Sequence, residues 1–90
     1  MVINNGIIIC FGILQPNYQL QPNQQYQWDI TLPTTYVGVI HIWHSKIQTG
    51  GWGQFDMGSS TLSMSEIAIR AWNGWTSFGL VNFRWFTIGY

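Results

Sequence analysis

Charged side chains are scarce in this chain of 90 residues, and their scarcity excludes some classes of protein at the outset. Asp, Glu, Lys and Arg make up 7% of the residues, against about 25% in ordinary soluble proteins. The formal net charge is zero, and the three bases, Lys46, Arg70 and Arg84, are far apart in sequence. We therefore expect no basic patch for a phosphate backbone and no nucleic-acid partner.

Cysteine and long hydrophobic runs are also nearly absent. The single cysteine, Cys10, has no partner for an internal disulfide and lies in an apolar run, which favours a buried, inert thiol over a nucleophile. That run, residues 7–14, is far too short to span a bilayer. It also lacks the preceding Lys or Arg and the small residues that mark a signal or lipoprotein sequence. The run is predicted to be a core strand, without insertion into a membrane.

No stretch has the sustained spacing of apolar residues that is typical of a helix. Alternating or continuous apolar runs between turns rich in Gly, Pro and Asn instead predict six short strands. A bulge or break is expected near Ser65, because the parity of Leu62 and Met64 does not match that of Ile67. Residues 15–25 contain two prolines and are predicted to form an extended loop. The predicted strands span residues 7–14, 26–32, 37–45, 54–57, 66–72 and 80–90.

The predicted strands are of two kinds. Antiparallel sheets normally leave one face in water, and two of the strands, 26–32 and 66–72, alternate apolar and polar residues accordingly. The strands 7–14, 37–45 and 80–90 instead carry large apolar residues on both faces. If these three form one sheet, its outer face exposes more apolar surface than a soluble monomer tolerates. At about 25 cal/mol per Å², covering it is worth on the order of 10 kcal/mol per subunit before association costs.

The fold class predicted from these patterns is all-β. We expect a single domain over residues 1–90, because a chain of this length is too short to bury a second independent core. Its architecture is predicted to be a six-stranded antiparallel β-sandwich. The sheet with two apolar faces is expected to turn inward in a homo-oligomer.

Three segments of the chain resemble the C-terminal receptor-binding head of bacteriophage tail fibres. They are NGIIICFG at 5–12, ITLPTTYVGVIHIW at 30–43 and FRWFTIGY at 83–90, and their order and spacing carry the resemblance. The resemblance covers nearly the whole chain. It implies a fold similar to that of the lectins typified by snail agglutinin (H-type lectins). Those lectins are six-stranded sandwiches assembled as homotrimers around a threefold axis, with sugar held at the subunit boundaries.

The resemblance also implies a position for a sugar-binding residue. In these lectins a Trp just after the fifth strand is followed by a His and, six residues after the Trp, by a Tyr, and all three contact the sugar. Trp72 stands at the position of the Trp, whereas Asn73 and Phe78 stand where the His and the Tyr would be. The identity of the sugar is therefore left open.

The predicted loops supply the groups that sugar recognition without catalysis needs. Aromatic faces pack on the C–H surface of a pyranose, while amides, carboxylates and backbone groups bind its hydroxyls. Three tryptophans lie in or beside predicted turns, where the alternative is that they cap the open ends of the sandwich. A solvated outer face is the default position expected for Arg70, and contact with the ligand is the alternative. The predicted ligand-binding residues are Trp52, Gln54, Asp56, Arg70, Trp72, Asn73, Trp75 and Phe78.

Metal binding and catalysis are not expected. His41 and His44 are three residues apart, so their imidazoles leave opposite faces of a strand and cannot chelate a metal together. Each is interpreted as a core or interface histidine, with a ring of one His from each of three copies as the alternative. Hydrolysis needs two carboxylates across a bond or a nucleophile with a base. Only Asp29, Asp56 and Glu66 are acidic, and no pair is predicted to converge, so we expect no enzyme activity, cofactor or metal.

The sequence thus predicts a trimeric, non-enzymatic head that recognises a bacterial surface glycan, lipopolysaccharide or another polysaccharide, at host attachment. Its expected location is the virion, at the tip of a phage or prophage tail fibre, after synthesis in the cytoplasm of the bacterial host. Its expected protein partners are other copies of itself and the fibre shaft or other tail proteins. Two alternatives remain: a trimeric structural module that docks virion proteins without binding sugar, and a free bacterial lectin.

Overall fold

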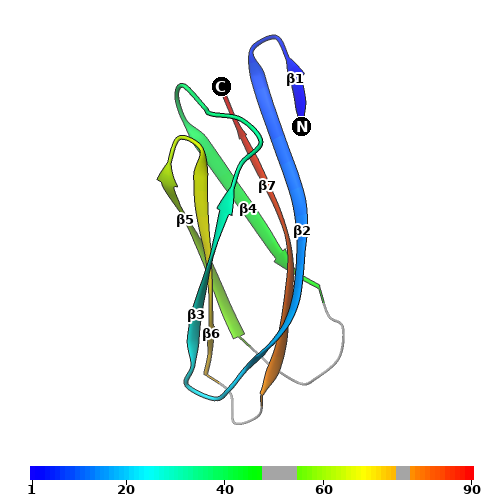
Figure 1. Cartoon of the computed structure of the whole chain (residues 1–90), viewed down its shortest axis with the longest axis vertical. Coiled ribbons are helices and arrows are strands. Elements are labelled where there is room, and N and C mark those ends of the chain that lie inside the picture. The colour runs from blue at the N-terminus through cyan, green and yellow to red at the C-terminus, as the bar shows by residue number, and fades with distance from the viewer. Residues whose placement is uncertain (48–54, 75–77) are drawn as a thin grey trace.

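The computed structural model describes residues 1–47, 55–74 and 78–90, which form strands joined by turns and short connections (Figure 1). A four-stranded sheet has the order β1-β2-β7-β4 and a three-stranded sheet the order β3-β6-β5, and every pairing is antiparallel. The described residues include no helix that could cross a membrane. The all-β, antiparallel prediction is confirmed. The strands are β1 (Val2–Asn4), β2 (Ile7–Leu20), β3 (Gln25–Thr31), β4 (Ile40–Lys46), β5 (Phe55–Ser63), β6 (Glu66–Asn73) and β7 (Gly79–Gly89).

The described part of the chain has seven strands, where the sequence predicted six. The additional strand, β1, pairs with β2 across a tight turn at Asn5 and Gly6, whose φ angles of 52° and 80° are positive. A turn with two positive φ angles suits a two-residue hairpin, and Asn followed by Gly is the favoured sequence. The short strand before this turn was not among the predicted strands.

The predicted loop at 15–25 is wrong over its first six residues, because β2 continues to Leu20. The pairing of β2 with β7 shifts register between Leu14 and Tyr18, so that Pro16 lies where no ladder bond is made. Asn17 adopts a φ of 49°, and its backbone N–H donates to Asn82 Oδ1 at 3.0 Å. The Asn82 side chain donates in return to Asn17 Oδ1, also at 3.0 Å. This pair of amides replaces the missing ladder bonds at the bulge.

Two other strand boundaries differ from the prediction. The segment predicted at 54–57 belongs to a longer strand, β5, whose register shifts between Thr61 and Ser63 before a turn at residues 64–65. The expected irregularity near Ser65 is therefore confirmed. The strand predicted from Val37 begins only at Ile40. Before it, the backbone N–H groups of Val37 and Gly38 both donate to the Tyr90 carbonyl, at 2.7 and 2.8 Å.

The sorting of the strands by their apolar faces is confirmed. The segments with two apolar faces form β2, β4 and β7, which are adjacent in the four-stranded sheet. The alternating segments form β3 and β6, which pair in the other sheet. The inner face of β7 carries Val81, Phe83 and Thr87, which are fully buried, and Trp85, which is nearly so.

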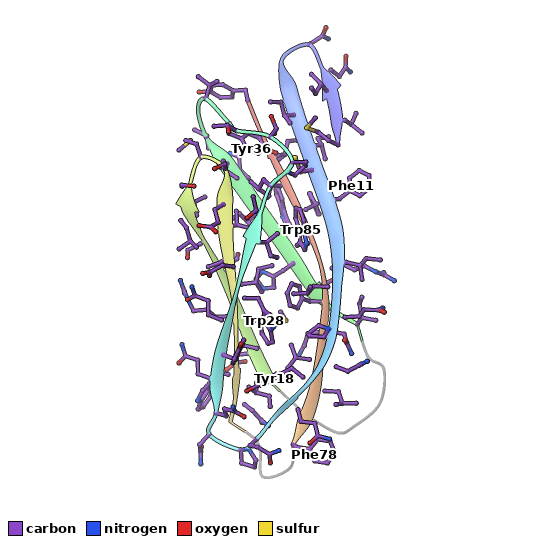
Figure 2. The ribbon with its side chains drawn as sticks, in the orientation of Figure 1. Phe11, Tyr18, Trp28, Tyr36, Phe78 and Trp85 are labelled. Atoms are coloured by element: carbon purple, nitrogen blue, oxygen red, sulfur yellow. The ribbon has the colours of Figure 1, made fainter. Side chains whose placement is uncertain are left out.

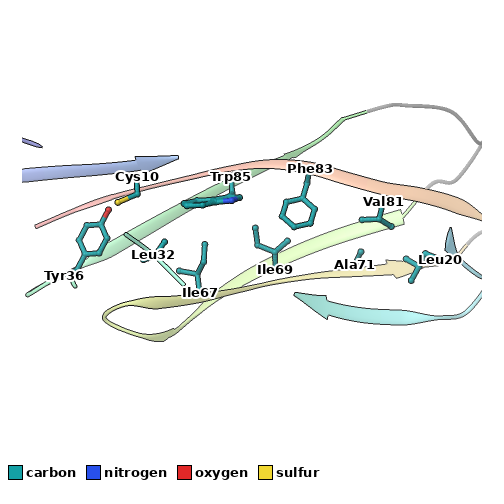
Figure 3. Close-up of a cluster of buried hydrophobic side chains, with 10 residues drawn as sticks. All are labelled: Cys10, Leu20, Leu32, Tyr36, Ile67, Ile69, Ala71, Val81, Phe83 and Trp85. Carbon is teal, nitrogen blue, oxygen red and sulfur yellow. The ribbon is translucent and has the colours of Figure 1, made fainter. Parts of the chain in front are cut away.

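The hydrophobic core lies between the two sheets (Figure 3). Gly12 permits one close contact in it, because a Cβ atom at this position would lie 2.7 Å from the Trp85 ring. The thiol of Cys10 is buried in the core, as predicted. The buried core residues are Cys10, Leu20, Leu32, Tyr36, Ile67, Ile69, Ala71, Val81, Phe83 and Trp85.

Tyr36 closes one end of this core and should make stability depend on pH. Its hydroxyl donates to the Ile8 carbonyl at 3.2 Å and hydrogen-bonds with Thr87 Oγ1 at 2.8 Å. Burial raises the pKa of Tyr36 above its ordinary value of 10.0. The folded state holds the Tyr36 proton more tightly than the unfolded state does. The contribution of the protonated Tyr36 hydroxyl to the free energy of unfolding is therefore complete below pH 10.0 and is lost as pH rises through the raised pKa.

We expect Tyr36→Phe to lower the free energy of unfolding by roughly 1–3 kcal/mol at pH 8, because it leaves the buried Thr87 hydroxyl without this partner. Urea unfolding at pH 8 and at pH 11 measures this. The difference between wild type and variant should shrink at the higher pH. Tyr90→Phe is the control, since Tyr90 is exposed. An unchanged difference at both pH values would contradict the assignment to the Tyr36 proton.

Candidate functional site

The outer face of the three-stranded sheet brings together three of the predicted ligand-binding residues. Trp72 on β6 lies opposite Asp56 on β5 and Gln25 on β3. Residues two apart on a strand share a face, so Arg70 lies next to Trp72 on the same surface. The Trp72 side chain is 44% exposed and Asp56 is exposed. We call this surface, formed by Gln25, Gln27, Asp56, Arg70 and Trp72, the Trp72 face.

Arg70 makes hydrogen bonds on this face to both neighbouring strands. Its Nε donates to Gln27 Oε1 at 3.0 Å, and its Nη2 donates to Ser60 Oγ at 2.6 Å. The Gln27 amide donates in turn to Asp29 Oδ1 at 2.7 Å. Arg70 therefore occupies the outer face expected for it by default, and there it lies in the same surface as Trp72.

Two glycines shape the Trp72 face. A Cβ atom at Gly74 would lie 2.6 Å from the Trp72 ring, so only glycine lets the indole take its position against the chain there. Gly58, opposite Arg70, has open space around it, with no atom within 4 Å of a Cβ placed there. The face therefore presents an indole beside an open, polar strip of sheet.

Asn73 does not belong to this face. The structure corrects the prediction that Asn73 contacts a ligand, because the residue is buried. The residue has no exposed surface, and its Nδ2 donates to the Leu20 carbonyl at 2.8 Å. Its backbone N–H donates to the Gln24 carbonyl at 3.0 Å, and its own carbonyl accepts from the Asn23 N–H at 2.6 Å. Asn73 thus fastens the turn between β2 and β3 and cannot reach a sugar.

Of the remaining predicted residues, the structure describes only Phe78. Phe78 is 43% exposed and precedes β7 at the lower end of the molecule (Figure 2). It adjoins a strand of the four-stranded sheet, whereas Trp72 lies on the other sheet. Trp52, Gln54 and Trp75 lie outside the described residues.

All three acidic side chains of the chain lie on the three-stranded sheet, one on each strand. Asp56 is at the end of the sheet near Trp72, and Glu66 is at the opposite end. Asp29 lies between these ends and accepts a hydrogen bond from Gln27. Among the residues that the structure describes, no three His, Cys, Asp or Glu side chains gather as they would around a metal ion.

A second surface was not foreseen as a site. The outer face of the four-stranded sheet has a groove of about 570 Å³ between β2 and β4, over β7. Phe11 projects from this face, away from the three-stranded sheet (Figure 2). Residues two apart on a strand share a face, so the sequence of β7 alone places Arg84 and Phe86 on one face. The residues of β2 and β4 beside them depend on strand order and register, which could not be predicted from the sequence. The groove is lined by Phe11, Gly12, Ile13, Trp43, His44, Ser45, Arg84, Trp85 and Phe86.

The two histidines leave opposite faces of β4, as predicted. His41 lies opposite Ile88 and is exposed, and its ring centroid is 6.2 Å from that of Trp43. His44 lies opposite the inward-facing Trp85, and its Nδ1 is buried without a hydrogen-bond partner among the described residues.

Comparison with protein-family models, with curated proteins and with solved structures finds no match in any of the three.

Proposed function

We propose that this chain is a non-enzymatic head domain that binds a bacterial surface glycan through the Trp72 face. The observation that carries the proposal is the half-exposed indole of Trp72 between Asp56 and Gln25 on a polar sheet surface. An indole offers a flat apolar surface to the C–H face of a pyranose. The neighbouring carboxylate and amide can accept and donate hydrogen bonds to hydroxyls on the sugar rim.

The fixed geometry of the Trp72 face also favours binding. Arg70 already makes hydrogen bonds to Gln27 and Ser60, so its guanidinium is ordered before a ligand arrives. Gly74 allows the indole to lie where it does. A surface that is ordered in advance loses less conformational entropy on binding. The face lies along three strands and is open, which suits a segment of an extended polysaccharide such as that of lipopolysaccharide.

We further propose that the two sheets form a β-sandwich that assembles as a homotrimer, with the four-stranded sheets turned toward the threefold axis. Support comes from the outer face of this sheet, where Phe11 is 62% and Ile13 is 60% exposed. Trp43 and Phe86 on the neighbouring strands are 48% and 41% exposed. Such a contiguous apolar surface is larger than monomeric proteins ordinarily leave in water.

The proposed location is the tip of a phage or prophage tail fibre, joined to the fibre shaft or to other tail proteins. The segments that carry the resemblance to tail-fibre heads support it, since they contribute to β2, β4 and β7. These three strands are neighbours in one sheet, so segments far apart in sequence form one continuous part of the fold. That sheet is also the one proposed to face the other copies.

We expect Trp72→Ala to reduce binding to a surface polysaccharide at least ~10-fold, because a lost stacking surface worth about 1.4 kcal/mol has this effect. Binding to a glycan array and to cells of candidate hosts measures the change. Leu62→Ala is the matched control, because Leu62 is a similarly exposed apolar residue at the other end of the same sheet. It should bind as the wild type does.

Two results would count against the proposal. If the wild-type chain shows no preference among saccharides but captures other tail proteins, it is a structural module of the virion. If Trp72→Ala and Leu62→Ala bind glycans equally, the sugar site lies elsewhere on the molecule. A gene neighbourhood without tail-assembly genes would favour a free lectin over a fibre tip.

A further inference from the structure

The groove on the outer face of the four-stranded sheet is built from two adjacent rows of side chains. The first row crosses three strands and is aromatic, since Phe86 on β7 pairs with Phe11 on one side and Trp43 on the other. The second row has Arg84 on β7 between Ile13 and Ser45. The groove volume of about 570 Å³ lies within the range of about 300–1,000 Å³ typical of small-molecule sites.

The aromatic row gives the groove an apolar wall. The rings of Trp43 and Phe86 are stacked, with centroids 4.7 Å apart and planes only 9° from parallel. Phe11 stands on the opposite strand and projects outward (Figure 2). Phe11, the stacked pair of Trp43 and Phe86, and Ile13 therefore line the apolar part of the groove.

Arg84 gives this apolar groove a positive charge. No Asp or Glu lines the groove, and all three acidic side chains of the chain are on the other sheet. A guanidinium in apolar surroundings is stabilised by an anion, and it binds a carboxylate through two parallel hydrogen bonds. The charge of the groove thus favours an acid group as its partner.

A second copy of the chain would not provide that partner. If two copies meet through their four-stranded sheets, neither sheet brings an acidic side chain to the other copy's Arg84. If the proposed assembly covers Arg84, the guanidinium leaves water without an acidic side chain from another copy, a cost that the assembly bears unless an anion occupies the groove. An occupant that carries its own acid group avoids this cost, whether the copies are separate or assembled.

We propose that this groove is a binding site for an amphipathic carboxylate, a molecule with an apolar body and one acid group. The carboxylate binds Arg84, with the Ser45 hydroxyl beside it in the same row. The apolar body lies against the stacked rings of Trp43 and Phe86 and is enclosed by Phe11 and Ile13. This site is on the opposite sheet from the Trp72 face and does not depend on glycan binding.

The test compares decanoate with decanol, which have the same chain length and differ in charge. Isothermal titration calorimetry of the full chain, at ligand concentrations below micelle formation, should show decanoate binding at least ~10-fold more tightly than decanol. Arg84→Gln should abolish this preference, and Arg84→Lys, which keeps the charge, should retain part of it. Trp43→Ala should weaken binding of both ligands. Arg70→Gln is the control, because it removes an arginine from the other sheet and should leave decanoate binding unchanged.

Three results would overturn the inference. Equal affinity for decanoate and decanol would show that Arg84 does not select the acid group. An effect of Arg70→Gln as large as that of Arg84→Gln would show a general response to charge. If neither ligand binds and the chain is an oligomer that Trp43→Ala dissociates, a second copy fills the groove. In that last case the proposed homotrimer is supported and the proposed carboxylate site is refuted. If neither ligand binds and the chain is a monomer, both proposals are refuted.

Discussion

Replacing Phe11 and Trp43 together by serine is expected to convert the proposed homotrimer into single chains. Both side chains lie in the aromatic row of the outer groove and are 62% and 48% exposed in the single chain. An aromatic side chain buries about 150–250 Å² when fully covered, at about 25 cal/mol per Å². Their loss should therefore remove several kcal/mol per subunit from association, which raises the dissociation constant by more than ~100-fold.

Sedimentation equilibrium at micromolar concentration measures this change, with a trimer expected for wild type and a monomer for the double variant. Leu62→Ser with Met64→Ser is the matched control. These side chains are 45% and 44% exposed but belong to β5 and the turn after it, on the other sheet. The control should remain assembled. A wild-type chain that sediments as a monomer would refute the proposed use of the four-stranded sheet.

Phe83→Ala should cause a large loss of stability. Phe83 is fully buried between the sheets (Figure 3), and its ring centroid is 5.5 Å from that of Trp28 on the opposite sheet. Truncating a buried Phe to Ala leaves a cavity and costs about 3–5 kcal/mol. Since whole domains are stable by only about 5–15 kcal/mol, much of the variant should be unfolded at moderate urea concentrations.

Urea unfolding followed by tryptophan fluorescence measures this loss. All samples need the same protein concentration, because assembly adds to apparent stability. Phe78→Ala is the control, since Phe78 is 43% exposed and its truncation opens no enclosed cavity. Its cost should be well below that of Phe83→Ala. A loss below ~1 kcal/mol for Phe83→Ala would mean that the core between the sheets is not packed as described.

Local alternation predicted much of the fold. The pattern around Trp28 and Ile69 identified strands with one polar face, and these pair directly in the three-stranded sheet. The continuation of β2 past Pro16 could not be predicted in this way. It depends on hydrogen bonds between Asn17 and Asn82, which are 65 residues apart in sequence, whereas the local run of Gln, Asn and Pro is typical of a loop.

The candidate site was predicted only in part. Alternation along β6 places Arg70 and Trp72 on one face, and by the same alternation it turns Asn73 inward. The sequence therefore held the signal against Asn73 as a ligand contact, but its place in a predicted turn between Trp72 and Trp75 led to its choice as a polar partner for the sugar. The position of Asp56 beside Trp72 depends on the register of β5, which no local pattern determines.

The placement of all carboxylate side chains on one sheet has a consequence for how the molecule meets a charged surface. Two of the three bases, Lys46 and Arg84, lie on the opposite sheet, so a chain of zero net charge has an electric dipole across its thickness. An anionic cell envelope would rotate the Trp72 face away from itself at low ionic strength. Salt screens such orientation beyond about 8–10 Å. When acidic and neutral saccharides are ranked by their binding affinity for the chain, the order should therefore differ between dilute buffer and physiological salt.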